Sequence, residues 1–345
     1  MEQHRVTLQL RAKGSFHTSK SRGQSGLTLV ELLVALVISL VIALAAVSSL
    51  IVSRRGLTTV DAAAQLGDNA RFASALLLRL GAQAGFRDVE YAATPRSNNT
   101  VGLAGAGAAN PDVSGVNNAY PSATDPYNSS TAWRTSSVGY GSDILILRHQ
   151  AVETFPGSGR SDMTMIDCSG TPSTTVPVDR DDRMVSVLYV DVSQGEPSLM
   201  CSTGPSTAQP IISGVENFQV LYGVAGVTPN TAPTATPVAP NVADRYLRAD
   251  QMVVAGNTAA TNANWSRVRS LRIGMVLRGA EGSTQQKEAQ TFYPLGLAKA
   301  SVTGTAGSAM SSARDDPGTI FTSPADTRLR QAVTFTIQLR NKEGL

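Results

Sequence analysis

The chain has 345 residues and a formal net charge of +3, and this length allows one large domain or two modest ones. Residues 1–26 carry a charge of +4, from five basic side chains and one acidic side chain, whereas the rest of the chain carries −1. Because the positive charge is confined to the N-terminal stretch, it is no evidence for nucleic-acid binding, which needs a basic patch on the folded domain.

The stretch from Gly23 to Leu36 places one carboxylate, Glu31, near the start of an apolar run that continues to Val52. A charge at membrane depth is energetically expensive unless it has a partner. A cut after Gly26 would supply one, because Leu27 would then carry a free α-ammonium group four residues before Glu31. In a helix, that spacing is about one turn on the same face.

This stretch, with Gly26, Leu27, Thr28, Leu29 and Glu31 followed by Leu, Val and Ala, resembles the type III signal of type IV pilins and pseudopilins. The resemblance implies cleavage after Gly26 by a prepilin peptidase and methylation of the new N-terminus at Leu27. It also implies that Glu31 helps a subunit to dock onto its neighbour's N-terminus. Leu27 departs from the phenylalanine usual in the family, and the 26-residue leader is long for it, which leaves the start codon open.

A secretory signal peptide and a simple membrane anchor are the alternatives for an apolar run near the N-terminus. A secretory signal needs a cleavage site with small residues, which the segment from Ala43 to Ser49 offers. However, the apolar core of such signals spans about 7–15 residues, whereas this run is longer and contains Glu31. We therefore favour the prepilin interpretation.

The segment from Leu27 to Val52 has 26 residues, and as a helix it would be about 39 Å long. The hydrocarbon core of a bilayer is about 30 Å thick, so this helix is long enough to span it. The positive-inside rule keeps the basic leader in the cytoplasm, so the downstream domain should lie in the periplasm. We expect a single-pass inner-membrane protein, and the resemblance implies its later transfer to the pilus fibre at the cell surface.

A second helical pattern follows Gly56, which is a candidate bend. Apolar residues recur there at steps of three and four: Leu57, Val60, Ala63, Leu66, Ala70, Ala73, Leu77 and Leu80. Such an amphipathic half should lay its apolar stripe on a globular domain. Gly81 and Gly85 mark the expected end. We therefore expect one long helix over residues 27–85, with a transmembrane half at 27–52 and an amphipathic half at 57–80.

Residues 86–345 should form a β-rich periplasmic domain with long loops. Residues 94–137 are rich in Ser, Asn, Gly, Ala and Pro and are expected to form a surface insertion. Beyond them, short β-branched runs alternate with turn-rich gaps at 225–245, 255–265 and 303–327. The expected strands are Asp143–His149, Met184–Val192, Val215–Tyr222, Arg267–Leu277 and Ala332–Leu339. The predicted fold class is α+β, a long N-terminal helix packed on an antiparallel β-sheet, as in pilins.

The strand expected at Arg267–Leu277 alternates polar and apolar residues. Its arginines, including Arg269 and Arg272, punctuate apolar residues such as Leu271 and Ile273. Such alternation is typical of a sheet with one buried face and one face in solvent.

Both cysteines of the chain, Cys168 and Cys201, lie beyond the membrane segment. An oxidising periplasm favours a disulfide between them, and a closed loop of about 33 residues would stabilise the domain by roughly 3–4 kcal/mol. Two free buried thiols are the alternative. A zinc site is not expected, since two cysteines and one nearby histidine do not complete its four ligands.

Histidine is nearly absent from the expected mature chain, which keeps only His149. A Ser-His-Asp or Cys-His site would have to use this residue, but no nucleophile-elbow pattern accompanies it. We interpret His149 as an ordinary edge or surface histidine at the end of a strand. No catalytic residue, metal site or cofactor is expected, and the chain is not expected to be an enzyme.

Three other patterns have ordinary structural interpretations. The run Asp179–Arg183 clusters carboxylates but lacks the spacing of an EF-hand, so we expect a solvated turn balanced by its arginines. Asp315 and Asp316, before Pro317, also indicate a turn. The stretch Gly102–Gly107 superficially resembles a phosphate loop, but no Lys-Ser/Thr pair completes it.

Four aromatic residues decorate the expected insertion, namely Tyr120, Tyr127, Trp133 and Tyr140. Exposed aromatic residues in a loop can anchor a partner protein. They can equally pin the loop to the sheet, and the sequence leaves both interpretations open.

Two further segments, Gly214–Gly223 and Thr336–Asn341, resemble the larger minor pilins of the PilW type. The resemblance implies a minor pilin that takes part in the initiation, assembly or tip of a type IV pilus. It also implies its partners: the prepilin peptidase, other minor pilins, the major pilin, the inner-membrane assembly platform and a tip adhesin. A J-type pseudopilin of a type II secretion system is the alternative. A membrane-anchored periplasmic enzyme is a third interpretation, which the scarcity of histidine disfavours.

Overall fold

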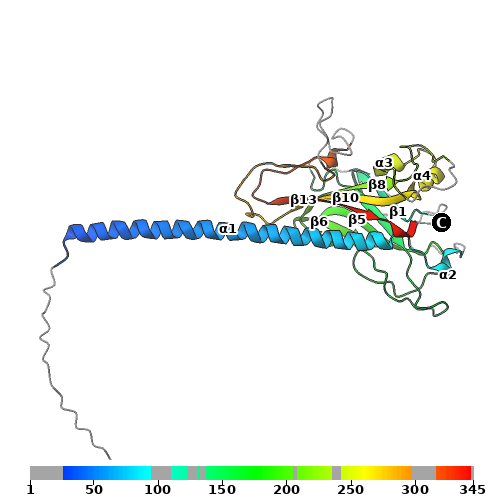
Figure 1. The fold of residues 1–345 in the computed structure, drawn as a ribbon, viewed down its shortest axis with the longest axis horizontal. Coiled ribbons are helices and arrows are strands. Elements are labelled where there is room, and N and C mark those ends of the chain that lie inside the picture. The colour runs from blue at the N-terminus through cyan, green and yellow to red at the C-terminus, as the bar shows by residue number, and fades with distance from the viewer. Residues whose placement is uncertain are drawn as a thin grey trace, which may run out of the picture. The chain divides into compact units, whose positions relative to one another are not determined.

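The structure is a computed structural model that describes residues 26–94, 110–122, 130–132, 137–204, 208–234, 242–296 and 316–342. The chain divides into two compact units, Met1–Gly56 and Leu57–Leu345. Figure 1 shows their helices and strands. The described part of the first unit is the start of one helix and the residues just before it, and the sheets belong to the second unit.

Helix α1 runs without interruption from Leu29 to Gln83. The segment is rich in Leu, Ala and Val and contains no proline, so every backbone amide after the first turn can donate within the helix. The candidate bend at Gly56 does not end the helix, since one glycine costs a helix interior only about 1 kcal/mol. Gly85 follows the helix with a φ of +78°, which is the left-handed conformation that often ends a helix. Gly81 instead lies inside it.

Within the second unit, α1 buries one stripe of its surface from Leu66 onward, which confirms that part of the amphipathic pattern, whereas Leu57 and Val60 of the predicted stripe are 61% and 65% exposed. The buried apolar residues are Leu66, Ala70, Ala73, Leu77 and Leu80. Gly81 brings the helix close to a strand, since a Cβ built on it would lie 2.5 Å from Cγ2 of Ile337. At the end of the helix, the Asn341 side chain donates to the backbone oxygens of Ala82 and Ala84.

The first sheet is antiparallel and has five strands in the order β1-β4-β5-β6-β7. Their bounds are β1 Val113–Val116, β4 Ile144–His149, β5 Met184–Ser193, β6 Glu196–Ser202 and β7 Gln209–Ser213. Strands β5 and β6 form a hairpin through Gln194 and Gly195, with φ of +52° and +83°. Two positive φ values are what a two-residue type I′ hairpin turn requires.

The second sheet is also antiparallel and has four strands in the order β13-β10-β8-β9. Their bounds are β8 Val215–Val224, β9 Arg245–Leu247, β10 Val268–Arg278 and β13 Arg330–Gln338. The register between β10 and β13 is regular over nine pairs, from Ser270–Gln338 to Arg278–Arg330. The register between β10 and β8 shifts at two places.

The remaining elements are short. Two two-stranded pairs join β2 Ala119–Pro121 to β3 Ser130–Ala132, and β11 Thr291–Phe292 to β12 Phe321–Thr322. The short helices are α2 Val89–Ala92, α3 Ala249–Met252, α4 Thr258–Trp265, η1 Pro317–Thr319 and η2 Arg340–Lys342.

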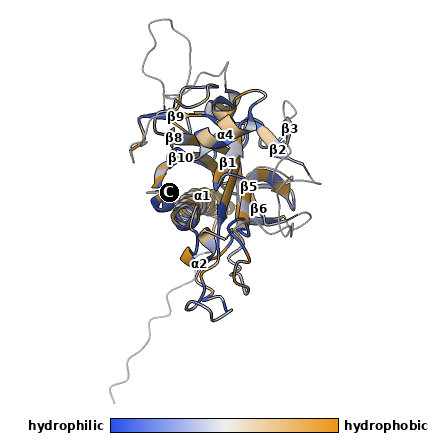
Figure 2. Cartoon of the chain, turned by 90° about the vertical axis from the view of Figure 1, so that its right-hand side faces the viewer, coloured by the Kyte–Doolittle hydropathy of each residue, from blue (hydrophilic) through white to orange (hydrophobic). Residues whose placement is uncertain are grey.

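One hydrophobic core joins α1 to both sheets. It contains Leu77 and Leu80 of α1, Leu188 of β5, and Phe218 and Leu271 of the second sheet. Figure 2 looks along α1 and shows β8 and β10 on one side of the helix and β5 and β6 on the other. The predicted fold class, a long helix packed on antiparallel β-structure, is therefore confirmed.

All five predicted strands are present, with bounds that differ from the prediction by no more than two residues. The prediction of a surface insertion at residues 94–137 is wrong for β1, which completes one edge of the first sheet. The gap predicted at 255–265 contains α4. In the gap predicted at 303–327, the described residues form η1 and β12.

The half-solvated face predicted for β10 is also wrong. Nearly all of the strand is buried, including Arg269, which is only 9% exposed. The second face is covered because the chain near Pro294 packs directly on it, and a Cβ on Gly274 would lie 2.4 Å from the Pro294 carbonyl oxygen. Glycine at this position allows that close approach.

Candidate functional site

The start of α1 is held by a reciprocal pair of side chains. The Glu31 carboxylate accepts hydrogen bonds, through Oε2, from the backbone amide and the hydroxyl of Thr28, each at 3.0 Å. In return, Thr28 Oγ1 accepts from the Glu31 amide at 3.2 Å. Since α1 begins at Leu29, Thr28 is the N-cap and Glu31 is the third helical residue. This arrangement is a capping box, which satisfies backbone donors that a helix start leaves free.

The residues at the predicted cleavage position lie immediately before this cap. Gly26, Leu27 and Thr28 precede the first helical turn, and all three are exposed. A Cβ built on Gly26 would meet nothing within 4 Å. Nothing in the described chain therefore requires glycine at this position, so any requirement for it comes from a molecule that approaches the backbone from outside.

Helix α1 is the one helix among the described residues that is long and apolar enough to cross a membrane. The hydroxyls in its apolar part bond within the helix, Ser39 to the Ala35 oxygen at 2.7 Å and Ser48 to the Ala45 oxygen at 2.9 Å. Such bonds satisfy these two hydroxyls within the helix. Glu31 is the one ionisable side chain in the segment from Leu27 to Val52.

The disulfide predicted between Cys168 and Cys201 is confirmed. Both residues are buried, at 1% and 0% exposed, and their Cα atoms are 5.7 Å apart. The bridge ties the long connection between β4 and β5 to strand β6 of the first sheet. The amide of Cys168 also donates to Ser186 Oγ on β5, at 2.9 Å.

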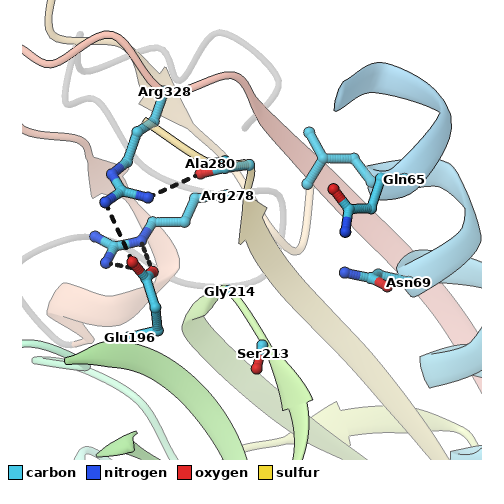
Figure 3. Close-up of a pocket in the computed structure, with 10 residues that line it drawn as sticks. Gln65, Asn69, Glu196, Ser213, Gly214, Arg278, Ala280 and Arg328 are labelled. Atoms are coloured by element: carbon cyan, nitrogen blue, oxygen red, sulfur yellow. Dashed lines mark hydrogen bonds and ion pairs between the residues drawn. The ribbon is translucent and has the colours of Figure 1, made fainter. Parts of the chain in front are cut away.

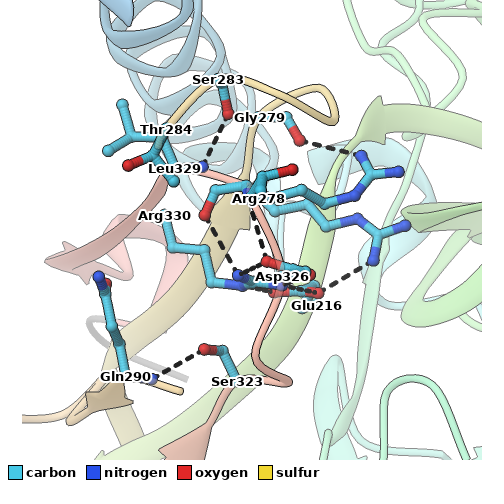
Figure 4. Close-up of polar contacts among 12 residues, drawn as sticks. Glu216, Arg278, Gly279, Ser283, Thr284, Gln290, Ser323, Asp326, Leu329 and Arg330 are labelled. Carbon is cyan, nitrogen blue, oxygen red and sulfur yellow. Dashed lines mark hydrogen bonds and ion pairs between the residues drawn. The ribbon is translucent and has the colours of Figure 1, made fainter. Parts of the chain in front are cut away.

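A charged cluster joins the start of β6, in the first sheet, to three strands of the second. Figure 4 shows its contacts among Glu216, Arg278, Asp326 and Arg330. Arg278 of β10 binds Glu216 of β8 at 3.1 Å and Glu196 of β6 at 2.8 Å. Arg330 of β13 binds Glu216 and Asp326, each at 2.6 Å. The side chains of Arg330 and Glu216 are only 2% and 6% exposed.

The charges of this cluster are balanced. Arg328 adds a third guanidinium, which binds Glu196 at 3.2 Å, so three arginines meet three carboxylates. The hydrogen bond from Arg278 holds the pKa of Glu196 below its ordinary value, and Arg330 does the same to the pKa of Asp326. Both carboxylates therefore stay ionised near neutral pH, which suits an ion-pair network rather than acid–base chemistry.

A pocket of about 280 Å³ opens beside the cluster (Figure 3). Gln65 and Asn69 of α1 line one side, and Arg278 and Arg328 line the other. Glu196 already binds both arginines. The lining contains no histidine or cysteine, so the pocket offers polar contacts but no activated nucleophile or neutral base.

The surface position predicted for His149 is wrong. The residue is only 1% exposed, and neither ring nitrogen has a hydrogen-bond partner within the described part of the chain. Burial lowers its pKa to about 4, so the ring is neutral at physiological pH. A nucleophilic site needs a histidine that hydrogen-bonds to a nucleophile, and His149 makes no such bond there.

The turn at Asp179–Arg183 is confirmed, but it is not solvated as predicted. Asp179 is 3% exposed and accepts from the amides of Asp181 and Asp182, at 2.8 and 3.0 Å. Arg183 binds Asp112 at 2.6 Å, so an arginine of the run pairs with a carboxylate outside it. Across the described residues, no group of three or more His, Cys, Asp or Glu side chains is placed to hold a metal ion.

Asp316 is the N-cap residue that precedes η1, in agreement with the turn predicted before Pro317. It is 1% exposed, and burial raises its pKa to about 6. Asp315 and the stretch Gly102–Gly107 lie outside the described residues.

Among the aromatic residues of the expected insertion, Tyr120 pins its segment to the first sheet. Its hydroxyl donates to Asp191 Oδ2 at 2.6 Å, and its ring meets the edge of Tyr189 with centroids 5.7 Å apart. Tyr140 lines a second pocket, of about 500 Å³. Tyr127 and Trp133 lie outside the described residues.

The structural roles of Thr28 and Glu216 were not predicted from the sequence. The spacing Thr28-x-x-Glu31 before an apolar run is itself the signature of a capping box, so the role of Thr28 could have been predicted from the sequence. The role of Glu216 could not have been predicted, because its partners Arg278 and Arg330 lie 62 and 114 residues away in the sequence.

Comparison with protein families gives two matches. Residues 21–47 match the prokaryotic N-terminal methylation motif, and residues 187–341 match the family described as Type IV Pilus-assembly protein W. Together with the capped N-terminal helix and its β-domain, they define the class as a type IV pilin-like protein. Within this class, the match over residues 187–341 is to the PilW family of pilus-assembly proteins.

A type IV-like pilin from Thermus thermophilus is similar in structure, with 14% sequence identity and a TM-score of 0.35. The match covers 81% of this chain and 98% of that one. At this score the likeness carries no argument about fold. No curated protein matches the chain.

Proposed function

We propose that this protein is a minor pilin, cut after Gly26 and then built into a type IV pilus during its initiation, its assembly or at its tip. The observation that carries the proposal is the methylation motif at residues 21–47, which leads directly into α1 with Glu31 as the one charge in the apolar segment. The match of residues 187–341 to pilus-assembly proteins supports a pilus rather than a secretion machine.

Processing is the chemistry that this chain undergoes. A prepilin peptidase hydrolyses the bond between Gly26 and Leu27, which leaves a carboxylate on Gly26 and an amine on Leu27. The amine then attacks the methyl group of a sulfonium donor, which leaves as a thioether, and the nitrogen loses a proton. The exposed, side-chain-free Gly26 lets a protease approach the backbone closely. The basic leader keeps this end in the cytoplasm, so the second unit lies in the periplasm until assembly.

Assembly uses the carboxylate of Glu31. Its Oε2 is held by Thr28, while Oε1 makes no bond within the described residues, so Oε1 can accept from the N-terminal ammonium of a neighbouring subunit. An unpaired charge is expensive in a bilayer, and this expense favours pairing. Other minor pilins, the major pilin, the inner-membrane assembly platform and a tip adhesin are the partners we propose.

The test compares Glu31→Gln with Glu31→Ala in the full-length protein. Glutamine keeps an acceptor for Thr28 but has no charge, so both variants should be cleaved normally and should be recovered in sheared pili at less than a tenth of the wild-type amount. Ser39→Ala is the matched control, because the Ser39 hydroxyl bonds only within the helix. Wild-type recovery of Glu31→Gln in pili would refute the proposal.

A further inference from the structure

Strand β13 has β10 on one side and forms an edge of the second sheet. The Leu339 amide donates to the Arg269 oxygen at 2.9 Å, and the Gly279 amide donates to the Leu329 oxygen at 2.8 Å. In an antiparallel pair, residues alternate between bonding to the neighbour and pointing away from it. The backbone groups that point away from β10 therefore belong to Ala332, Thr334, Thr336 and Gln338.

Three of these four outward-facing residues are exposed to solvent. Ala332, Thr334 and Gln338 are exposed, and Thr336 is half-buried. Their backbone amides and carbonyls make no hydrogen bond in the part of the chain that the structure describes. A row of unpaired backbone groups of this kind is a template for another strand.

The other edges of the two sheets carry features that protect edges from pairing. Strand β1 has four residues and β9 has three. Strand β7 contains Pro210, and its register with β6 shifts between Leu199 and Met200. Shortness, proline and bulges each blunt an edge.

Strand β13 has none of these features. It has nine residues and an unshifted register with β10. From residue 331 to residue 339 it contains no charge, proline or glycine. Long, regular and uncharged edges are avoided in proteins that remain unpaired, so this edge is suited to pairing.

The side chains beside the edge leave an apolar strip partly uncovered. Val333 and Phe335 face the core but are only half-buried. On α1, Leu78 lies one turn before Gly81, which contacts Ile337, and it is 45% exposed. An added strand would lay alternate side chains over this strip.

We propose that the free edge of β13 is an interaction surface to which another pilus subunit adds an extended strand. Main-chain hydrogen bonds to Ala332, Thr334, Thr336 and Gln338 hold it. The β-branched or aromatic side chains of the added strand face α1, and its small or polar side chains lie beside Thr334 and Thr336. The inference rests on the proposed function.

The direction of β13 disfavours a second copy of this chain as the occupant. Arg328, just before β13, shares a pocket with Gln65 and Asn69 of α1, and Ile337 near its end contacts Gly81. Strand and helix therefore run the same way. An antiparallel two-fold pairing of two β13 strands would turn the two α1 segments of the second unit in opposite directions, whereas copies joined head to tail in one filament all point the same way.

The first test compares Thr336→Pro with Thr336→Ala in the full-length protein, in cells that make pili. Proline removes an outward amide and leaves the bonds to β10 intact, whereas alanine keeps the amide. We expect recovery of Thr336→Pro in sheared pili to fall at least tenfold and Thr336→Ala to remain within twofold of wild type. Equal recovery of both would overturn the inference.

A second pair of variants covers the case in which Thr336→Pro fails to fold, as judged by loss of the Cys168–Cys201 disulfide. Ala332→Lys places a charge on the exposed edge, and Ala332→Ser is its control. We expect the lysine variant alone to be excluded from pili. Normal incorporation of this folded variant would overturn the inference.

A photo-reactive benzoylphenylalanine at Gln338 identifies the occupant. A cross-link to an extended segment of another pilus subunit, lost on adding Thr336→Pro or Ala332→Lys but kept with the matched control, supports the inference. A cross-link to a second copy or within the chain overturns it. If the wild type enters pili and the edge variants do so equally, the inference alone fails; if the wild type never enters pili, the proposed function fails as well.

Discussion

The Glu31 carboxylate and Thr28 bind each other at the first turn of α1, with Thr28 donating twice to one carboxylate oxygen and accepting the Glu31 amide in return. Glu31 therefore has a structural role before any partner binds. It caps the helix, and the hydrogen bonds with Thr28 fix the position of the Glu31 side chain. It also leaves the second carboxylate oxygen for a neighbour. The helix start is thus preorganised for the contact that we propose.

The Thr28 hydroxyl should therefore position Glu31. Thr28→Val removes the hydroxyl but keeps the shape and the backbone amide, and loss of such a cap costs about 1 kcal/mol. We expect normal cleavage but a several-fold drop in the processed protein that reaches sheared pili, a smaller loss than for Glu31→Ala. Thr28→Ser should behave as wild type. Equal incorporation of the Val and Ser variants would show that the hydroxyl does not position Glu31.

The charged cluster should respond unequally to the loss of its two glutamates. Glu216→Gln leaves Arg278 and Arg330 without a buried partner charge, which should destabilise the protein by about 3–5 kcal/mol. Glu196 is 43% exposed, so Glu196→Gln should cost less than about 1 kcal/mol. Urea unfolding of the full-length protein in detergent measures both. A cost for Glu196→Gln equal to that of Glu216→Gln would contradict the account.

Two glycines of α1 form another matched pair. A Cβ at Gly81 would lie 2.5 Å from Ile337, whereas one at Gly67 meets nothing within 4 Å. Gly67→Ala should stabilise the protein by up to about 1 kcal/mol, through helix propensity. Gly81→Ala must push Ile337 aside, at a cost of about 1–3 kcal/mol. The same unfolding experiment checks the sign of each change, and a stabilised Gly81→Ala would show that the contact is loose.

Stability should fall in acid because of His149. Its pKa is about 4 in the folded protein and about 6.5 when unfolded, so the unfolded state takes up the proton first as the pH falls. The free energy of unfolding is therefore unaffected by His149 above pH 6.5. Between pH 6.5 and about pH 4 it falls by about 1.4 kcal/mol per pH unit. His149→Leu should lack this slope. An unchanged slope in the variant would place the acid sensitivity elsewhere.

The elements with strong local patterns were predictable. The apolar steps from Leu66 to Leu80 indicate which face of α1 is buried, and β-branched runs locate β5, β8 and β10 within two residues. The disulfide followed from compartment and cysteine count, since only one pairing of Cys168 and Cys201 exists. These inferences depend on periodicity and chemistry that lie within short stretches of sequence.

The wrong predictions have a common physical cause. In each case, residues that are distant in the sequence cover a segment that was expected to be exposed. The alternation in β10 predicted a solvated face, but the chain near Pro294 covers Gly274, and remote carboxylates pair Arg278. His149 is buried for the same kind of reason, since its neighbours come from tertiary packing. Strand β1 escaped notice because four residues within a Gly- and Asn-rich stretch give almost no local signal.

If this chain is a processed prepilin, its N-terminus must depend on prepilin peptidase. The full-length protein is purified from membranes of cells with and without prepilin peptidase, and its intact mass and N-terminal sequence are determined. We expect a peptidase-dependent start at Leu27 that carries one added methyl group. A leader that is intact in both strains, or a start near Ser48, would contradict it and would remove the basis for the assembly role of Glu31.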